Sequence, residues 1–225
     1  MRLLLINPNS TVAMTEAAAA VARRMLPEAE ILGWTNHDGP PAIQGPEDGI
    51  AALGGLRALL PRARAERVDA LVIACFDDTG LEEIRAKAHC PVIGIGQAAM
   101  HLATLLGGRF SVVTTLPVSV PVIEANVAAY GFGGHCARVR PSGLPVLEVE
   151  AAGPRVMARL ADEIAAAASG DGAATVVLGC AGMAPLRPSL QESSPVPLVD
   201  GIEAACVLAG ALARWKAETA WGRAP

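Results

Sequence analysis

Short apolar runs and longer alanine-rich stretches alternate along the whole chain. The apolar runs have the length and continuous hydrophobic character of strands that are buried on both faces. They are Leu3–Ile6, Ala29–Leu32, Ala70–Ala74, Val92–Ile95, Phe110–Thr114, Thr175–Leu178 and Val196–Val199, with a weaker run at Ala137–Arg140. The stretches of helical length and composition are Met14–Met25, Gly49–Arg64, Gln97–Leu106, Val118–Tyr130, Pro154–Ala168 and Ile202–Ala217. This order predicts an α/β fold with parallel sheets, whose ligands bind outside the carboxyl ends of the strands.

The two halves of the chain carry matching segments. Cys75 ends one apolar run and lies 16 positions before Pro91, and Cys180 ends another and lies 17 positions before Pro197. An Ala-Ala pair follows each proline, and the openings Arg2–Asn7 and Arg109–Thr114 also agree. Such an internal repeat predicts two pseudo-symmetric lobes, each a parallel sheet flanked by helices, with the active site in the cleft between them.

The glycine pair after Leu106 is the expected boundary between the lobes. We expect the first lobe to cover residues 1–107 and the second lobe to cover residues 108–201. The C-terminal helix, residues 202–225, is then free to pack back on the first lobe.

Composition limits the function. A chain of 225 residues with 52% hydrophobic content can bury a core as one large or two small domains. A net charge of −4 without a basic block argues against nucleic-acid and anionic-membrane partners, so we expect small-molecule partners and leave a homo-oligomer open. No run approaches a membrane span, and the apolar run before Asn7 is too short for a signal peptide. Five cysteines without a Cys-x-x-Cys spacing predict reduced thiols and a cytoplasmic protein.

Five motifs resemble the aspartate/glutamate/hydantoin racemase superfamily, and within it the hydantoin and allantoin racemase branch. They are Ile6–Thr11, Pro41–Pro46, Ala74–Leu81, Val112–Thr115 and Leu178–Met183, in the family's order. The resemblance implies two pseudo-symmetric α/β lobes and no metal or pyridoxal phosphate. It also implies that the two cleft cysteines, here Cys75 and Cys180, act as paired acid and base.

Chemistry supports the same two cysteines. A hydrogen next to a carbonyl leaves as a proton only if a base is in place and the resulting enolate is stabilised. Inversion needs a thiolate on one face and a thiol on the other, and a helix N-terminus after each strand is expected to lower the thiol pKa. A lone cysteine is most often a small buried hydrophobe. The equivalence of Cys75 and Cys180 across the repeat favours catalysis, whereas Cys90, Cys136 and Cys206 have no counterpart and are interpreted as structural.

The loops at the strand ends supply the predicted substrate-binding residues. Asn9 either directs its amide at the substrate or lies in a loop where Ser10 or Thr11 caps the next helix. Thr114 and Thr115 occupy the matching point and either bind substrate or only end a strand. Backbone N–H groups around each cysteine are the expected oxyanion sites. The predicted set is Asn9, Ile43, Gly45, Phe76, Asp77, Thr79, Thr114, Thr115, Ala181 and Gly182.

The loop Pro40–Pro46, which contains Ile43 and Gly45, is proline-rich and stiff. We interpret it as a lid over the substituent of the substrate. An ordinary turn-rich connection is the alternative.

Phe76, Asp77 and Asp78 bear on the substrate. Amino-acid racemases of the superfamily typically have Asn-Thr after the first cysteine, which suits a free carboxylate. Acidic side chains repel a negatively charged substrate but accept hydrogen bonds from the N–H groups of a neutral cyclic ureide. Alternatively, one aspartate caps the following helix and the other is solvated. Because a carboxylate opposes thiolate formation, we expect at least one of them to point away from Cys75.

The resulting hypothesis is a cofactor-independent racemase of 5-substituted hydantoins or allantoin. An aspartate/glutamate racemase and a maleate isomerase-like enzyme are the alternatives within the superfamily. A two-lobed metabolite-binding module is the non-enzymatic alternative, although it has no need for two mirrored thiols. The histidines lack zinc-site spacing, and Gly94–Ala99 lacks the acidic residue of a dinucleotide fingerprint, so we predict neither site.

Overall fold

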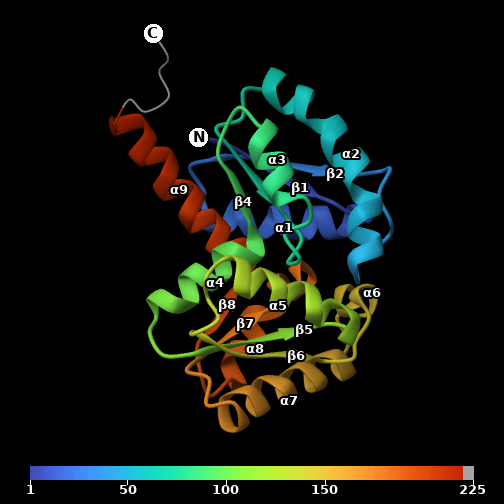
Figure 1. Ribbon diagram of the computed structural model, residues 1–225, viewed down its shortest axis with the longest axis vertical. Coiled ribbons are helices and arrows are strands. Elements are labelled where there is room, and N and C mark those ends of the chain that lie inside the picture. The colour runs from blue at the N-terminus through green and yellow to red at the C-terminus, as the bar shows by residue number, and fades with distance from the viewer. Residues whose placement is uncertain (220–225) are drawn as a thin grey trace.

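The computed structural model describes residues 1–219 and contains two four-stranded parallel sheets (Figure 1). The first sheet has the order β2-β1-β3-β4, and its strands are β1 Arg2–Asn7, β2 Glu30–Thr35, β3 Ala70–Ile73 and β4 Val92–Gly94. The second has the order β6-β5-β7-β8, with β5 Phe110–Thr114, β6 Cys136–Pro141, β7 Thr175–Leu178 and β8 Leu198–Asp200. All six strand pairings are parallel. The same order in both sheets confirms the predicted α/β fold with two equivalent lobes.

The helices follow the strands in βα order. They are α1 Val12–Met25, α2 Pro46–Ala65, α3 Leu81–Lys87, α4 Ile95–Leu105, α5 Val120–Ala129, α6 Val146–Ala151, α7 Pro154–Gly170, α8 Arg187–Ser193 and α9 Gly201–Thr219, with 3₁₀ turns η1 Pro117–Ser119 and η2 Ala181–Leu186. The short helices α3, α6 and α8 were not predicted, because they have too few turns to show a helical period in the sequence. The last predicted strand begins two residues late, at Leu198, because β8 pairs with β7 only from there to Asp200.

Each strand of the first sheet contributes side chains to two cores, because successive side chains point to opposite faces. Leu3 and Leu5 of β1 belong to a core with α1, α4 and α9, whereas Leu4 and Ile6 belong to a core with α2 and α3. The second sheet is divided in the same way. Val113 of β5 packs with α6, α7 and α8. Both faces of each sheet are therefore covered, as a parallel sheet requires.

Helices α4 and α9 connect the lobes. They pack against each other, α9 also packs on α1, and Figure 1 shows α9 running from the second lobe along the side of the first. Small side chains such as Ala22, Ala99 and Ala205 are fully buried in this region and allow the helices to approach closely. The lobe limits at residues 107 and 201 stay a prediction, and the predicted helix beyond Thr219 lies outside the described residues. Within residues 1–219, no helix combines the length and apolar character of a membrane span.

Asn36 anchors the loop after β1 to helix α2. Its amide donates to the carbonyl oxygen of Pro8 at 2.9 Å and to that of Ala52 at 3.0 Å, and its side chain is buried. The side chain fits against α2 only because Gly55 has no Cβ, since an added Cβ would lie 1.8 Å from Asn36 Oδ1. This contact fixes the position of the Pro8–Thr11 loop.

We therefore expect Gly55→Ala to lower the free energy of unfolding by about 1–3 kcal/mol, because the methyl group overpacks the site. The neighbouring Gly54→Ala is the matched control. Nothing lies within 4 Å of its added Cβ. Alanine there should raise the free energy of unfolding by up to about 1 kcal/mol through helix propensity. Urea unfolding of both variants tests this, and equal stabilities would contradict the packing account.

Candidate active site

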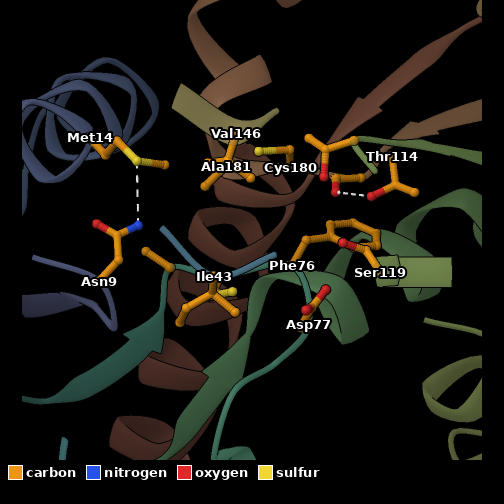
Figure 2. A pocket seen from close by; sticks show the side chains of 14 residues that line it. Asn9, Met14, Ile43, Phe76, Asp77, Thr114, Ser119, Val146, Cys180 and Ala181 are labelled. Atoms are coloured by element: carbon orange, nitrogen blue, oxygen red, sulfur yellow. Dashed lines mark hydrogen bonds between the residues drawn. The ribbon is translucent and has the colours of Figure 1, made fainter. Parts of the chain in front are cut away.

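A small cavity lies between the lobes, at the carboxyl ends of the strands (Figure 2). Its volume is about 20 Å³, which is room for about one water molecule. The residues that line it are Asn9, Met14, Ile43, Ala74, Cys75, Phe76, Asp77, Thr114, Thr115, Ser119, Val146, Gly179, Cys180 and Ala181. Cys75 and Cys180 are thus together in one cavity, as the repeat suggested.

The repeat explains how the two sulfurs meet. Cys75 lies two residues after the end of β3, and Cys180 lies two residues after the end of β7, the equivalent strand of the second sheet. Cys75 is half-buried and Cys180 is buried. The remaining cysteines, Cys90, Cys136 and Cys206, do not line the cavity.

The sulfur of Cys75 receives two hydrogen bonds from its own turn. The Thr79 hydroxyl donates to Sγ at 3.4 Å, and the backbone N–H of Asp77 also donates to it. Both donors stabilise a thiolate. Burial nevertheless raises the pKa of Cys75 well above its ordinary value, and the Asp77 carboxylate raises it further.

Cys180 has a similar environment with a single donor. Burial raises its pKa to about 12, the backbone N–H of Gly182 lowers it, and Asp77, Glu150 and Asp200 raise it through their charges. Burial therefore disfavours the thiolate form of both cysteines. The expected lowering by helix N-termini is wrong for Cys75, because α3 begins only at Leu81, and at Cys180 the 3₁₀ turn η2 does not offset burial.

The two adjacent aspartates point in different directions. Asp77 lines the cavity, and burial raises its pKa to about 7. Asp78 points away from Cys75 and accepts hydrogen bonds from the backbone N–H groups of Gly96 and Gln97, at 2.9 and 2.7 Å. It also accepts one from the Tyr130 hydroxyl of the second lobe at 2.9 Å. Asp78 therefore caps a helix, as one alternative proposed, but the helix is α4 rather than the one that follows it in sequence.

In the second lobe the carboxylate that caps the equivalent helix, α9, comes from a different sequence position. Asp200 accepts hydrogen bonds from the backbone N–H groups of Ile202 and Glu203, the second and third residues after it, with the Glu203 bond at 2.9 Å. By strand register Asp200 corresponds to Gly94, since Leu178 pairs with Asp200 as Ile73 pairs with Gly94. The lobes thus place a buried carboxylate at the start of α4 and of α9 from two unrelated sequence positions.

Asn9 is held with its amide nitrogen at the cavity. Its Oδ1 accepts hydrogen bonds from Asn7 Nδ2 at 2.8 Å and from Thr11 N at 2.9 Å, while its Nδ2 donates to Met14 Sδ at 3.4 Å (Figure 2). Capping by the Thr11 hydroxyl is wrong, because that hydroxyl donates to Pro41 O at 2.7 Å. Because the Met14 sulfur is a weak acceptor, the Asn9 amide N–H can donate instead to an oxygen of a ligand in the cavity.

The two threonines differ in their hydrogen bonding. The hydroxyl of Thr114 donates to the carbonyl oxygen of Gly179 at 3.0 Å, so its proton is used in a hydrogen bond within the second lobe (Figure 2). Thr115 also lines the cavity and is buried.

The loop Pro40–Pro46 is attached to the second lobe through Gln44. The Gln44 carbonyl oxygen accepts a hydrogen bond from the Ser119 hydroxyl at 2.9 Å, and Gln44 Oε1 accepts one from Val146 N at 3.1 Å. These contacts hold Ile43 against the cavity, where its side chain is buried. Gly45 and Thr79 line a neighbouring pocket instead, and Gly182 meets the site through its N–H on Cys180.

Several residues that line the cavity were not predicted from the sequence. They are Met14, Ala74, Ser119, Val146 and Gly179. Met14 had a usable signal, since it is one helical turn past the Asn9 loop. Ser119 and Val146 carried none, because they reach the cavity only through the packing of the second lobe against Gln44. Within residues 1–219, no three His, Cys, Asp or Glu side chains are grouped as metal ligands.

The profile of the Asp/Glu/Hydantoin racemase family matches residues 3–209. The chain is 45% identical to hydantoin racemase from Rhizobium meliloti over 213 residues, which is 94% of this chain and 88% of that protein. The structure of allantoin racemase from Klebsiella pneumoniae matches with a TM-score of 0.92 and 39% identity, over 96% of this chain and 88% of that chain. A glutamate racemase isoform from Bacillus anthracis matches with a TM-score of 0.70 at 18% identity, over 95% of this chain and 82% of that one, which shows the fold alone.

The position of Asp77 leads to a test of the site's electrostatics. Because its charge raises the pKa of both thiols, Asp77→Asn should lower both pKa values and shift the pH dependence of Cys75 alkylation to lower pH. Iodoacetamide labelling with peptide mapping should show severalfold faster reaction at pH 8. Asp38→Asn, at an exposed site away from the cavity, is the control and should leave the profile unchanged. Superimposable profiles for Asp77→Asn and the unaltered protein would contradict this account.

Proposed function

Because the chain belongs to the Asp/Glu/Hydantoin racemase family, we propose that it is a cofactor-independent racemase of 5-substituted hydantoins or allantoin. In this proposal Cys75 and Cys180 are the two acid/base groups. The observation that carries it is that two thiols from equivalent positions of a repeated fold line the same cavity. The likeness to hydantoin and allantoin racemases supports the substrate class.

In the proposed mechanism the two sulfurs act on opposite faces of C5 of the ring. One cysteine, as thiolate, takes the proton from C5 and becomes a thiol. The electron pair moves to the adjacent carbonyl oxygen, which backbone N–H groups beside Phe76 or Ala181 stabilise. The other cysteine then delivers its proton to the opposite face of C5 and becomes the thiolate. Because one sulfur gains the proton that the other loses, their protonation is coupled and the charge of the pair is unchanged.

The polarity of the cavity supports a neutral substrate. Among the described residues that line it, none is a lysine, arginine or histidine, and one is the acidic Asp77. The carboxylate groups of aspartate, glutamate or maleate would have no cationic partner there, whereas the N–H groups of a ureide ring match the Asp77 carboxylate. This favours the hydantoin and allantoin branch over the other two enzymatic alternatives. A binding module without catalysis leaves the paired thiols unexplained.

The proposal extends to the protein's setting. We propose that it acts on small-molecule substrates in the cytoplasm, where a reducing environment keeps the thiols in the form that catalysis requires. Cys75, Cys136, Cys180 and Cys206 are free thiols in the structure. Association into a homo-oligomer stays an expectation that size-exclusion chromatography tests.

Substrate preference is the first test. We expect kcat/KM for a 5-alkylhydantoin or allantoin to exceed that for aspartate and glutamate by at least about 100-fold, because a buried unpaired carboxylate is costly. Optical rotation of single enantiomers follows each reaction. Faster turnover of aspartate or glutamate would move the protein to the amino-acid branch.

The two-cysteine mechanism has a sharper test. Cys75→Ser and Cys180→Ser should each abolish net racemisation, because serine is too weak a base at neutral pH. With one thiol left, a single enantiomer can still exchange its C5 proton for a solvent deuteron on one face without inversion. Proton NMR of each enantiomer in D2O should therefore show exchange of opposite enantiomers by the two variants.

Cys136→Ser is the matched control, since Cys136 is a half-buried thiol of β6 that does not line the cavity. It should racemise and exchange both enantiomers at the rate of the unaltered protein. Racemisation by either Cys75→Ser or Cys180→Ser at that rate would remove the two-cysteine mechanism but leave the substrate assignment standing.

A further inference from the structure

A second, larger pocket adjoins the cavity. This side pocket has a volume of about 400 Å³, which is within the usual range of small-molecule sites. Its walls are the start of α2, from Gly45 to Leu53, the segment Asp77–Glu83 after Cys75, and Val122 of α5 in the second lobe. Like the cavity, it therefore lies where the two lobes meet.

Two residues connect the side pocket to the proposed chemistry. Asp77 lines both the side pocket and the cavity. Thr79 lines the side pocket, and its hydroxyl donates to Cys75 Sγ at 3.4 Å. The side pocket therefore begins one side chain away from a proposed catalytic sulfur.

The side pocket is mainly apolar. Its hydrocarbon surface comes from Ile50, Leu53, Leu81 and Val122. At Gly49 the wall is open, which means that a side chain there would extend into the pocket: an added Cβ would have only Thr79 Cγ2 within 4 Å, at 3.9 Å.

The acidic groups at the edge of the side pocket are already paired. Arg57 and Lys87 both bind the Glu83 carboxylate at 2.6 Å, and Arg85 binds Glu82 at 2.6 Å. Asp77, where the two spaces meet, forms no salt bridge among the described residues. A ligand group that extends from the cavity past Asp77 into the side pocket therefore contacts apolar side chains.

We propose that the side pocket receives the substituent at C5 of the hydantoin ring and selects branched alkyl substituents. The inference rests on the proposed function, since it needs a hydantoin ring beside Cys75. The side pocket and the cavity share Asp77 as a wall, so a substituent on a ring held beside Cys75 can extend into the side pocket. The apolar walls favour an isobutyl group over the polar ureido group of allantoin, because ureido N–H groups would lose their hydrogen bonds there.

The test fills the side pocket from its open wall. In Gly49→Leu the new side chain occupies the space proposed for the substituent, while leucine is a better helix former than glycine, so the helix is not weakened. We expect kcat/KM for 5-isobutylhydantoin to fall roughly tenfold more than kcat/KM for 5-methylhydantoin. Gly54→Leu is the matched control in the same helix, with nothing within 4 Å of its added Cβ, and should leave both values unchanged. The unaltered protein should also prefer 5-isobutylhydantoin to allantoin.

The outcomes separate the two proposals. If the unaltered protein racemises 5-methylhydantoin but Gly49→Leu lowers both substrates equally, or neither, the side pocket is not the substituent site and the proposed function stands. A preference for allantoin over 5-isobutylhydantoin also overturns the inference alone. If the unaltered protein racemises none of the three ureides, the proposed function fails, and the inference fails with it.

Discussion

The buried carboxylate of Asp78 is the interaction on which the site's geometry depends. It accepts hydrogen bonds from two backbone N–H groups of α4 and from Tyr130 of the second lobe, so it joins three segments that are distant in sequence. Asp78 holds a left-handed backbone conformation, with φ of 51°, and its N–H bonds to the carbonyl oxygen of Cys75 at 3.0 Å. The position of Cys75 is therefore set by the same carboxylate that fixes the turn to both lobes.

Burial controls the chemistry of the site as well as its shape. It raises the pKa values of both cysteines and of Asp77, so the cavity favours the neutral form of all three groups. Gln44 accepts hydrogen bonds from Ser119 and Val146, and Asn126 donates one to the Asp77 carbonyl oxygen; these bonds cross between the lobes and hold the walls of the cavity together. Each of these hydrogen bonds makes only a modest net contribution to stability.

Sequence reasoning succeeded where the signal was local or repeated. The strands Phe110–Thr114 and Thr175–Leu178 were predicted to the residue because unbroken apolar runs end there. The cysteine pair followed from the repeat, which specifies that two positions are equivalent. The direction of Asp78 and the contacts of Gln44 depend on partners 18 and 102 residues away, which no local pattern encodes. The pKa of each thiol likewise depends on how far burial raises it and hydrogen-bond donors lower it, and both effects arise only in the packed structure.

The two helix-capping carboxylates also constrain how the lobes can diverge from one another. In the first lobe an added Cβ at Gly94 would lie 2.2 Å from Asp78 Oδ1, so a side chain at residue 94 and the Asp78 carboxylate compete for one volume. Asp200 uses that equivalent position in the second lobe. A lobe can hold one arrangement or the other, but not both. Converting one into the other by single substitutions passes through a chain with two colliding carboxylates or with an uncapped buried helix start, which makes residues 78 and 94 an epistatic pair.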